Sequence, residues 1–542
     1  MKLSRLFRLF ALALLLTLAI SYSLNASAPA KIQLVVVLVI DQFRPDYLER
    51  FKPLLSGGLK SLYEHGVVFT NASFQHAITE TCPGHATIVT GAHPKEHGIV
   101  ASWWLDRDSK DIRYCVEDGT HRRAPSTLLR STLADWLKAS DEHSRAFSVA
   151  GKDRSAILLG GHSAQGAIWF EPEQGAFASS SYYQAIDEKW LSALNTAVSA
   201  RNYFGSSWTA HPSIEKAGRL DRFGLVAPDY GDFHSGFPRS LGGLSLAPSE
   251  DFFSDIASSP ILDELTVDAA LFTLKQHNLG EGSSTDYLAI GISGHDRIGH
   301  AFGPDSVEIL DSVLRIDSSL AKLFHYLDSN VGRGRYLIVV TADHGIKSLP
   351  EVKRLKGQSV RRLSADDYSC VQNAGERIAE AFQRSPLFIA KYYLAQEAAQ
   401  SIPRAELDKH VQEELSRCDF VARVLSSAQI ESASQDQLST DKDLAYYYNS
   451  HLPSRSQDYY LLLKESVIDA PDQRTGHGTI SAEDRAVPVI LMGAGLGPKR
   501  IEDPFALHDL ATTVASLLGI SGPDDVSGTD RSALLISPRP AP

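Results

Sequence analysis

Residues 32–41 read IQLVVVLVID, an apolar and mostly β-branched run that ends in Asp41. Such a run is typical of a central strand in a parallel sheet, because both faces of that strand are buried. Three later runs have the same character, TDYLAIGIS at 285–293, RYLIVVTAD at 335–343 and AVPVILMGAG at 486–495. We therefore expect all of these runs to form strands.

Amphipathic patterns lie between the strand-like runs, at residues 126–139, 306–329 and 509–520. Apolar residues that recur with a helical period predict helices at these places. Strands that alternate with helices predict an α/β fold, in which a central, mostly parallel sheet carries helices on both faces. In open α/β sheets, sites gather at the carboxyl ends of the strands, and several of these runs end in or near Asp or His.

Two segments interrupt this alternation. Residues from about 170 to 255 are rich in Ser, Gly, Pro and aromatic residues, and those from about 350 to 455 are polar and partly helical in pattern. We interpret both as cap segments inserted into one catalytic domain at 29–542. They either shape a substrate cleft or only cover the sheet.

The first 28 residues have the pattern of a secretory signal peptide. Basic residues precede an apolar stretch at 9–20, and a small-residue cleavage site ends at Ala28. The alternative is a membrane anchor, but the apolar stretch is short for a membrane span. The sequence therefore predicts a periplasmic or secreted protein, with no stable membrane insertion once the peptide is cleaved near Ala28.

The overall charge of the chain is mildly acidic. Its 542 residues include 53 basic and 65 acidic ones, for a formal net charge of -12, and no long run of Lys or Arg occurs. Nucleic-acid binding through a basic surface is therefore not expected. An anionic substrate would have to be held by a local cationic site and not by the field of the whole protein.

Four cysteines are present, Cys82, Cys115, Cys370 and Cys418. An exported protein can keep disulfides, and four cysteines allow three pairings that the sequence alone does not separate. Of these pairings we favour Cys82 with Cys115 and Cys370 with Cys418. The spacings match no structural zinc motif.

Several residues have the side chains and the placement of metal ligands. They are Asp41, Asp296 and His300 in SGHDRIGHAFG, Asp343 and His344 in IVVTADHG, and His477 in RTGHGTI. Three carboxylates and three imidazoles suit zinc, with some tolerance for other divalent metals. An isolated Asp at a strand end is usually a cap or turn residue, but this combination in one α/β chain favours metal binding.

The candidate nucleophile lies in TETCPGHATIVTGAHPKEHGI at 79–99. Thr81 precedes Pro83 and Gly84, and a helical pattern follows. A hydroxyl at a helix N-terminus faces free backbone N–H groups, which also favour a bound phosphate. The alternative is that Thr81 only caps the helix. As a nucleophile the hydroxyl would need activation, which a bound metal can supply.

Together these residues resemble the alkaline phosphatase superfamily over most of residues 32–520. The motifs that carry the resemblance are VVVLVIDQFRPDYL, T-x-P-x-H with the later TG, P and HGI, D-x-x-x-H, ADHG and GHG. The resemblance implies two zinc ions, one held by Asp41, Thr81, Asp343 and His344, and the other by Asp296, His300 and His477. It also implies that Thr81 attacks phosphorus and forms a phospho-threonine, which water then hydrolyses.

The segment AGKDRSAILLGGH favours the bacterial monoesterase branch of this superfamily. Its Lys152 and Arg154 match a Lys-x-Arg pair that the resemblance assigns to the phosphoryl oxygens. A monoester has one more anionic oxygen than a diester, so a cationic pair there selects monoesters. The alternative is a surface turn. One departure is Ser102, which stands three residues after HGI where the branch usually has Asn; Ser is shorter and has one donor.

The predicted function is thus a secreted, zinc-dependent alkaline phosphatase that hydrolyses small phosphate monoesters. A phosphodiesterase or nucleotide pyrophosphatase would use the same ligands and nucleophile but would lack the Lys/Arg pair. A sulfatase is disfavoured, because Cys82 is followed directly by Pro83 and no Arg stands where its motif requires one. A secreted binding protein without turnover is disfavoured, because every ligand position that the resemblance implies is occupied.

Overall fold

The computed structural model describes residues 31–226, 236–243, 245–390, 392–395, 400–470 and 474–535. The signal peptide predicted at residues 1–28 lies outside these ranges. None of the helices within them combines the length and the apolar character needed to cross a membrane.

Within the described part of the chain, a nine-stranded sheet has the order β10-β9-β8-β13-β1-β14-β21-β2-β22. β1 (Leu34–Ile40) lies between β13 (Asp286–Ile292) and β14 (Tyr336–Thr341) and is parallel to both. Every residue of these strands is buried, which explains why their sequences are continuous apolar runs. The first three runs predicted as strands therefore form the middle of the sheet.

The outer strands complete the sheet. β8 (Ala146–Ala150) and β9 (Gly166–Glu171) extend the parallel part, and β10 (Ala176–Ala178) is antiparallel to β9. On the other side, β21 (Val489–Gly493) is antiparallel to both β14 and β2 (Val67–Phe69), and β22 (Lys499–Ile501) is parallel to β2. The predicted mostly parallel sheet is confirmed, and the fourth predicted run is a strand of reversed direction.

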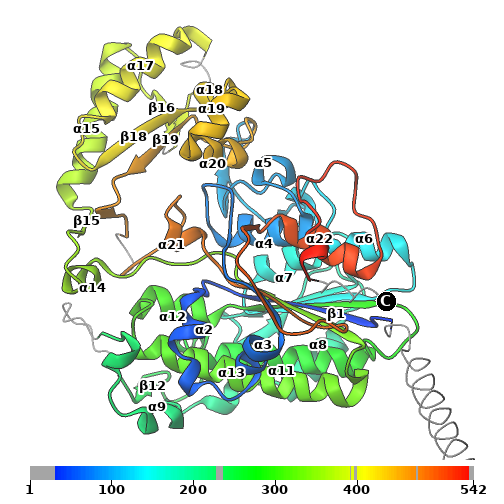
Figure 1. The fold of residues 1–542 in the computed structure, drawn as a ribbon. Coiled ribbons are helices and arrows are strands. Elements are labelled where there is room, and N and C mark those ends of the chain that lie inside the picture. Colours follow the sequence, from blue (N-terminus) through cyan, green and yellow to red (C-terminus); the bar gives the residue numbers. More distant parts are fainter. Residues whose placement is uncertain are drawn as a thin grey trace, which may run out of the picture.

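Helices cover both faces of the sheet (Figure 1). One face carries α3 (Gly58–His65), α11 (Pro260–His277) and α13 (Val307–Leu327), and the other carries α4 (Thr81–Thr90), α7 (Asp153–Gly160) and α22 (Asp509–Leu518). In α13 the buried residues Ile309, Val313, Ile316 and Leu320 recur at helical spacing and give the helix one apolar face. The helices predicted at 306–329 and 509–520 are α13 and α22.

The helix predicted at 126–139 begins later than expected, which corrects the prediction. α6 begins at Leu133 and ends at Ser140. The Thr132 hydroxyl accepts a hydrogen bond from the Asp135 backbone N–H, and the Asp135 carboxylate accepts one from the Thr132 N–H. This reciprocal pair satisfies free donors of the first turn and fixes the start of the helix.

Residues from about 350 to 470 include a hydrophobic core of their own, and Figure 1 draws this part at the top. α15 (Ala365–Ala381) packs against α17 (Arg404–Leu415), and α17 packs against β18 (Val421–Ser426). β18 pairs with β19 (Tyr459–Leu463) in an antiparallel ladder. The Cys370–Cys418 disulfide joins α15 to the chain just after α17.

The segment from about 170 to 255 is arranged differently, because it packs on the main core. Phe177, Trp208 and Phe252 belong to the same buried cluster as the central strands. The segment also contains two amphipathic helices, α8 (Glu188–Ala197) and α10 (Glu250–Ala257). Its aromatic residues therefore serve the main core, which the composition alone did not reveal.

Candidate metal centre and nucleophile

The first cluster of candidate ligands consists of Asp41, Asp343 and His344. Asp41 directly follows β1, and Asp343 and His344 follow β14 after one intervening residue. Because β1 and β14 are parallel neighbours, their carboxyl ends meet at the same edge of the sheet. One ligand atom of each residue lies within 4.8 Å of the others, and all three residues are buried.

The second cluster consists of Asp296, His300 and His477. Asp296 and His300 lie one turn apart on α12 (Gly294–Phe302), and His477 comes from the loop before α21 (Ala482–Arg485). The Nε2 atom of His300 lies 3.2 Å from Asp296 Oδ1 and 3.2 Å from His477 Nε2. Two imidazole nitrogens and a carboxylate oxygen therefore converge on one point, as the ligands of a metal do.

The orientation of the imidazoles also fits a metal. Each ring places Nδ1 at hydrogen-bond distance from a backbone carbonyl oxygen: 3.0 Å for His300 and Thr475, 2.8 Å for His477 and Thr79, and 3.0 Å for His344 and Gly345. A ring that donates its Nδ1–H in this way keeps Nε2 free as a ligand. Consistent with this, the buried atoms Asp41 Oδ1, Asp343 Oδ2 and His344 Nε2 have no hydrogen-bond partner among the described residues. The donor set therefore fits divalent metal ions of the zinc type.

Lys152 lies between the two clusters. Its ammonium donates a hydrogen bond of 2.6 Å to Asp41 Oδ2 and another of 2.6 Å to Asp296 Oδ2. Burial raises the pKa of Asp296, but the charges of Lys152 and His300 outweigh it and hold this pKa well below its usual range. Burial and the neighbouring carboxylates raise the pKa of Asp41 to about 6. The Lys152 ammonium thus joins the two clusters electrostatically.

The segment that contains Thr81 lies between the same two clusters. The Thr79 carbonyl oxygen holds the ring of His477 from the second cluster. His85 contacts the first cluster, because its Nδ1 atom lies 3.2 Å from Asp343 Oδ2 and 2.8 Å from the Thr81 carbonyl oxygen. Thr81 stands between these two anchor residues in the chain, so its backbone is tied to both clusters.

Thr81 is the first residue of α4 and is not its cap. Glu80 occupies the cap position with extended backbone, and its side chain makes no capping hydrogen bond. The Thr81 side chain, which is 4% exposed, therefore stands at the N-terminus of the helix, where backbone N–H groups are free. The interpretation of Thr81 as a simple helix cap is wrong.

Gly84 allows α4 to come this close to the end of β14. A Cβ atom at this position would lie 2.1 Å from the Asp343 carbonyl oxygen, far inside contact distance. Only glycine fits here without moving the helix or the strand end. The sequence T-C-P-G-H therefore sets the distance between the candidate nucleophile and the first cluster.

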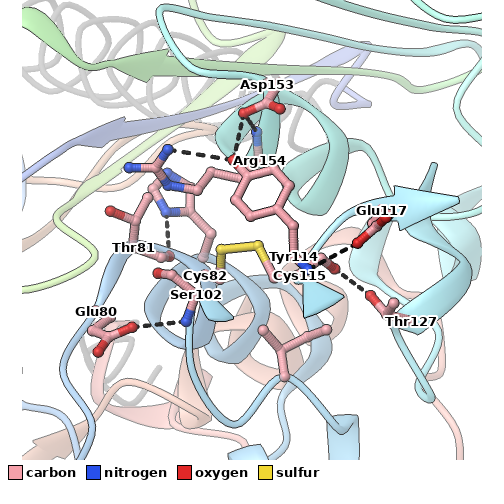
Figure 2. The surroundings of a disulfide bond; sticks show 12 residues. Glu80, Thr81, Cys82, Ser102, Tyr114, Cys115, Glu117, Thr127, Asp153 and Arg154 are labelled. Atoms are coloured by element: carbon pink, nitrogen blue, oxygen red, sulfur yellow. Dashed lines mark hydrogen bonds between the residues drawn. A yellow bond between two sulfur atoms is a disulfide. The ribbon is translucent and has the colours of Figure 1, made fainter. Parts of the chain in front are cut away.

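Arg154 and Ser102 lie near Thr81, around the Cys82–Cys115 disulfide, as Figure 2 shows. The favoured pairing of all four cysteines is thus present in the structure. Arg154 belongs to α7, and its Nη1 donates a hydrogen bond of 3.4 Å to the Tyr114 hydroxyl. The Ser102 backbone N–H donates one of 2.7 Å to the Glu80 carboxylate.

Known proteins share this fold and these motifs. A family model, type I phosphodiesterase / nucleotide pyrophosphatase, matches residues 35–469. The chain belongs to this family. The predicted membership of the alkaline phosphatase superfamily is thereby confirmed, because phosphodiesterases of this type are part of the group that the motifs resemble.

Several bacterial proteins are similar to the chain over nearly its whole length. The chain is 30% identical over 519 residues to the alkaline phosphatase PhoV of Synechococcus elongatus, which covers 92% of both chains. It is 30% identical over 530 residues to a Myroides odoratus protein named calcium-transporting ATPase, covering 92% of this chain and 94% of that one. It is 28% identical to the alkaline phosphatase PafA of Elizabethkingia meningoseptica over 538 residues.

A crystal structure of PafA has the same fold. It superposes with a TM-score of 0.83 at 27% sequence identity and covers 94% of this chain and 100% of the PafA chain. The predicted α/β class is confirmed by this likeness. The structural similarity to PafA also includes the segments that we interpreted as insertions, since nearly the whole of both chains is matched.

No role was predicted from the sequence for Gln42 or His85, although both contact the clusters. Gln42 donates from Nε2 to Asp296 Oδ1 at 2.6 Å and from its backbone N–H to Asp343 Oδ1 at 3.2 Å, so it bridges both clusters. Its backbone is left-handed, with φ of 69°, which no sequence pattern indicates for Gln. His85 is the His of the T-x-P-x-H motif, and its position four residues after Thr81, on the same helix face, could have indicated its contact with the first cluster.

Proposed function

We propose that this protein is an alkaline phosphatase that hydrolyses small phosphate monoesters at a two-zinc site, with Thr81 as the nucleophile. The observation that carries the proposal is the pair of ligand clusters, joined by Lys152 and tied to the start of α4. The chain is a phosphoric monoester hydrolase by its relationship to the alkaline phosphatases PhoV and PafA.

Seven residues would hold the two ions. One ion would take Asp41, Asp343, His344 and the Thr81 hydroxyl, and the other would take Asp296, His300 and His477. When bound, the ions supply charge stabilisation for the attacking and the leaving oxygen of an in-line displacement. Gln42 and the backbone carbonyls that accept from the imidazoles keep the ligands in place.

The reaction is a double displacement. The Thr81 hydroxyl gives its proton to water and its Oγ1 atom forms a bond to phosphorus as the ester P–O bond breaks, and the leaving alkoxide takes a proton from water. A water molecule then attacks the phospho-threonine, returns the Thr81 hydroxyl and releases inorganic phosphate. The free N–H groups at the start of α4 favour the negative charge of the phosphoryl group during both steps.

Arg154 and Lys152 would select monoesters. The Arg154 guanidinium is held by the Tyr114 hydroxyl, and its Nε atom is buried without a hydrogen-bond partner among the described residues. A charged phosphoryl oxygen is a suitable acceptor for such a group. Ser102 stands beside Glu80 and would offer the phosphoryl group one hydroxyl donor in place of the amide of Asn.

A phosphodiesterase or nucleotide pyrophosphatase is the second candidate, because the matching family model carries that description. It would use the same ligands and the same Thr81. The cationic pair distinguishes the two candidates, since a diester has no second anionic oxygen to meet it. Export to the periplasm or beyond the cell remains part of the proposal and rests on the sequence of residues 1–28.

Arg154→Ala is expected to lower kcat/KM for an aryl phosphate monoester roughly 10- to 100-fold, because the variant loses one charge-assisted hydrogen bond to the substrate. The matching methyl diester should lose less than about threefold, because it presents less charge to Arg154. Arg154→Lys serves as the control that keeps the positive charge. Steady-state kinetics on both esters check the prediction, and equal losses on the two would remove the basis for monoester selection. Lys152→Ala is a less specific probe, since Lys152 also contacts Asp41 and Asp296.

A further inference from the structure

Trp103 directly follows Ser102 and is one of the exposed large apolar residues of the described chain. It opens β4 (Trp103–Leu105), which pairs with β5 (Ile112–Tyr114) in an antiparallel hairpin. Successive strand residues point to opposite faces. Trp104 is 3% exposed and its ring lies 5.1 Å below the Arg455 guanidinium, so Trp103 points the other way and is 57% exposed.

The exposed ring is nevertheless held in one place. Trp103 pairs across the hairpin with Tyr114, and the two ring centroids lie 4.3 Å apart with an interplanar angle of 33°. Tyr114 is itself buried, and its hydroxyl donates a hydrogen bond of 2.7 Å to Asp153. Contact with a fixed aromatic ring limits the rotamers of Trp103, which lowers the conformational entropy that is lost when a ligand binds.

The hairpin is also fixed relative to the nucleophile. Cys115, next to Tyr114, is bonded to Cys82, next to Thr81. On the other strand, the Ser102 N–H is held by Glu80. Figure 2 shows Tyr114 beside Arg154 and the disulfide. The pair of aromatic residues Trp103 and Tyr114, which we call the aromatic platform, therefore adjoins Arg154 through the Tyr114 hydroxyl.

A groove of about 1690 Å³ runs past the platform. Glu80, His477 and Trp103 line it on the side of the sheet, and Tyr392, Tyr446 and Tyr460 line it on the side of the segment at about 350–470. His477 is a candidate ligand of the second cluster, so the groove reaches the edge of the metal centre. A phosphate ion fills only a small part of a space that is larger than most ligand pockets.

The charges of the groove argue against a polyanionic occupant. Basic and acidic side chains line it in equal number, so they supply no net field for a nucleic acid strand or a polyphosphate. Tyrosine and tryptophan side chains are instead prominent in the lining. Such surfaces bind planar rings by stacking and by contact of flat apolar faces.

We propose that the aromatic platform binds the planar aromatic ring of a substrate's leaving group while the phosphate occupies the metal centre. This inference rests on the proposed phosphomonoesterase function and adds a substrate class to it: phosphate monoesters whose alcohol carries a nucleobase or an aryl ring. Because the ring lies away from the reacting phosphorus, the contact is equally strong before and during the reaction. It therefore lowers KM and leaves kcat nearly unchanged.

The test compares pairs of esters that share the same kind of leaving oxygen and differ in the ring. The first pair is adenosine 5′-monophosphate and ribose 5-phosphate, and the second is benzyl phosphate and cyclohexylmethyl phosphate. Trp103→Ala should raise KM for the aromatic member roughly 5- to 100-fold, the range of a lost stacking contact. The non-aromatic member should change less than about twofold, and Trp103→Phe should retain most of the affinity.

Each outcome bears on the inference. A KM increase for adenosine 5′-monophosphate alone assigns the platform to nucleosides, and an increase for benzyl phosphate alone assigns it to simple aryl groups. Either of these results, or both together, supports the inference. Equal losses within each pair, or none, would overturn it. Leu355→Ala is the control, because Leu355 is 69% exposed and does not line the groove. It should leave all four KM values unchanged.

A binding measurement separates this inference from the function on which it rests. In Thr81→Ala protein, calorimetric titration should show tighter binding of adenosine 5′-monophosphate than of ribose 5-phosphate, and Trp103→Ala in the same background should remove the difference. A wild-type protein that hydrolyses no monoester but still shows this difference would contradict the proposed function and support the platform. A wild-type protein that hydrolyses both esters with equal KM would support the proposed function and contradict the platform.

Discussion

Thr81→Ala protein is expected to fold normally and to lose phosphomonoesterase activity by about four orders of magnitude or more, the scale seen when a covalent nucleophile is removed. The substitution deletes the oxygen that would bond to phosphorus and adds no atom. The hydrogen-bond contact of Thr81 with the His85 ring involves the Thr81 backbone carbonyl oxygen, so the substitution leaves it in place. Alanine is also favourable in the first turn of a helix.

The matched control for this prediction is Thr90→Ala on the same helix. Thr90 is fully buried, and its hydroxyl donates to the Ala86 carbonyl oxygen and lies outside both ligand clusters. The Thr90→Ala variant should keep kcat within about threefold of the wild-type value, while its melting temperature falls by a few degrees. Turnover of an aryl phosphate and thermal unfolding of both variants check the prediction. Wild-type-like turnover in Thr81→Ala would mean that another group attacks phosphorus.

Removal of metal is expected to abolish activity just as completely. Dialysis against a chelator should leave a folded protein without turnover, and about two equivalents of zinc should restore it. Zinc should also raise the melting temperature, because it binds the folded clusters and not the unfolded chain. Metal analysis after gel filtration should find about two ions per wild-type chain and fewer in His344→Ala and His300→Ala, each of which lacks one ligand of a different cluster.

Asp317→Asn is the control for the metal experiment. Asp317 is as buried as the candidate ligands, but its carboxylate accepts hydrogen bonds from the backbone N–H groups of Ser56 and Gly57 and not from either cluster. This variant should lose stability and keep its zinc. Full turnover of a chain that metal analysis shows to be free of zinc and other divalent ions would contradict a metal-dependent mechanism.

Much of the fold could be predicted because burial leaves a simple record in the sequence. β1, β13 and β14 are buried on both faces, and their sequences are continuous apolar runs for that reason. The candidate ligands were recognisable because Asp and His at strand ends combine rare residue types with a favoured position. The structure brings six of them into two clusters.

Other features depend on contacts that leave no local pattern. The start of α6 is set by Thr132 and Asp135, whose capping pair overrides the apolar period upstream. The contacts of Gln42 depend on a left-handed backbone between two strand ends. The groove joins Glu80 and Trp103 to Tyr460, residues that are far apart along the chain. Such arrangements follow from tertiary packing and not from the residues of one segment.

We propose that this site hydrolyses phosphate monoesters in preference to diesters. The most direct test is kcat/KM of the zinc-loaded protein for an aryl phosphate monoester and for the matching methyl diester. We expect a preference for the monoester on the order of a hundredfold or more, because the charge-assisted contacts of Arg154 and Lys152 need the additional anionic oxygen. A preference for the diester would contradict the assignment and would make the protein a phosphodiesterase with the same ligands and nucleophile.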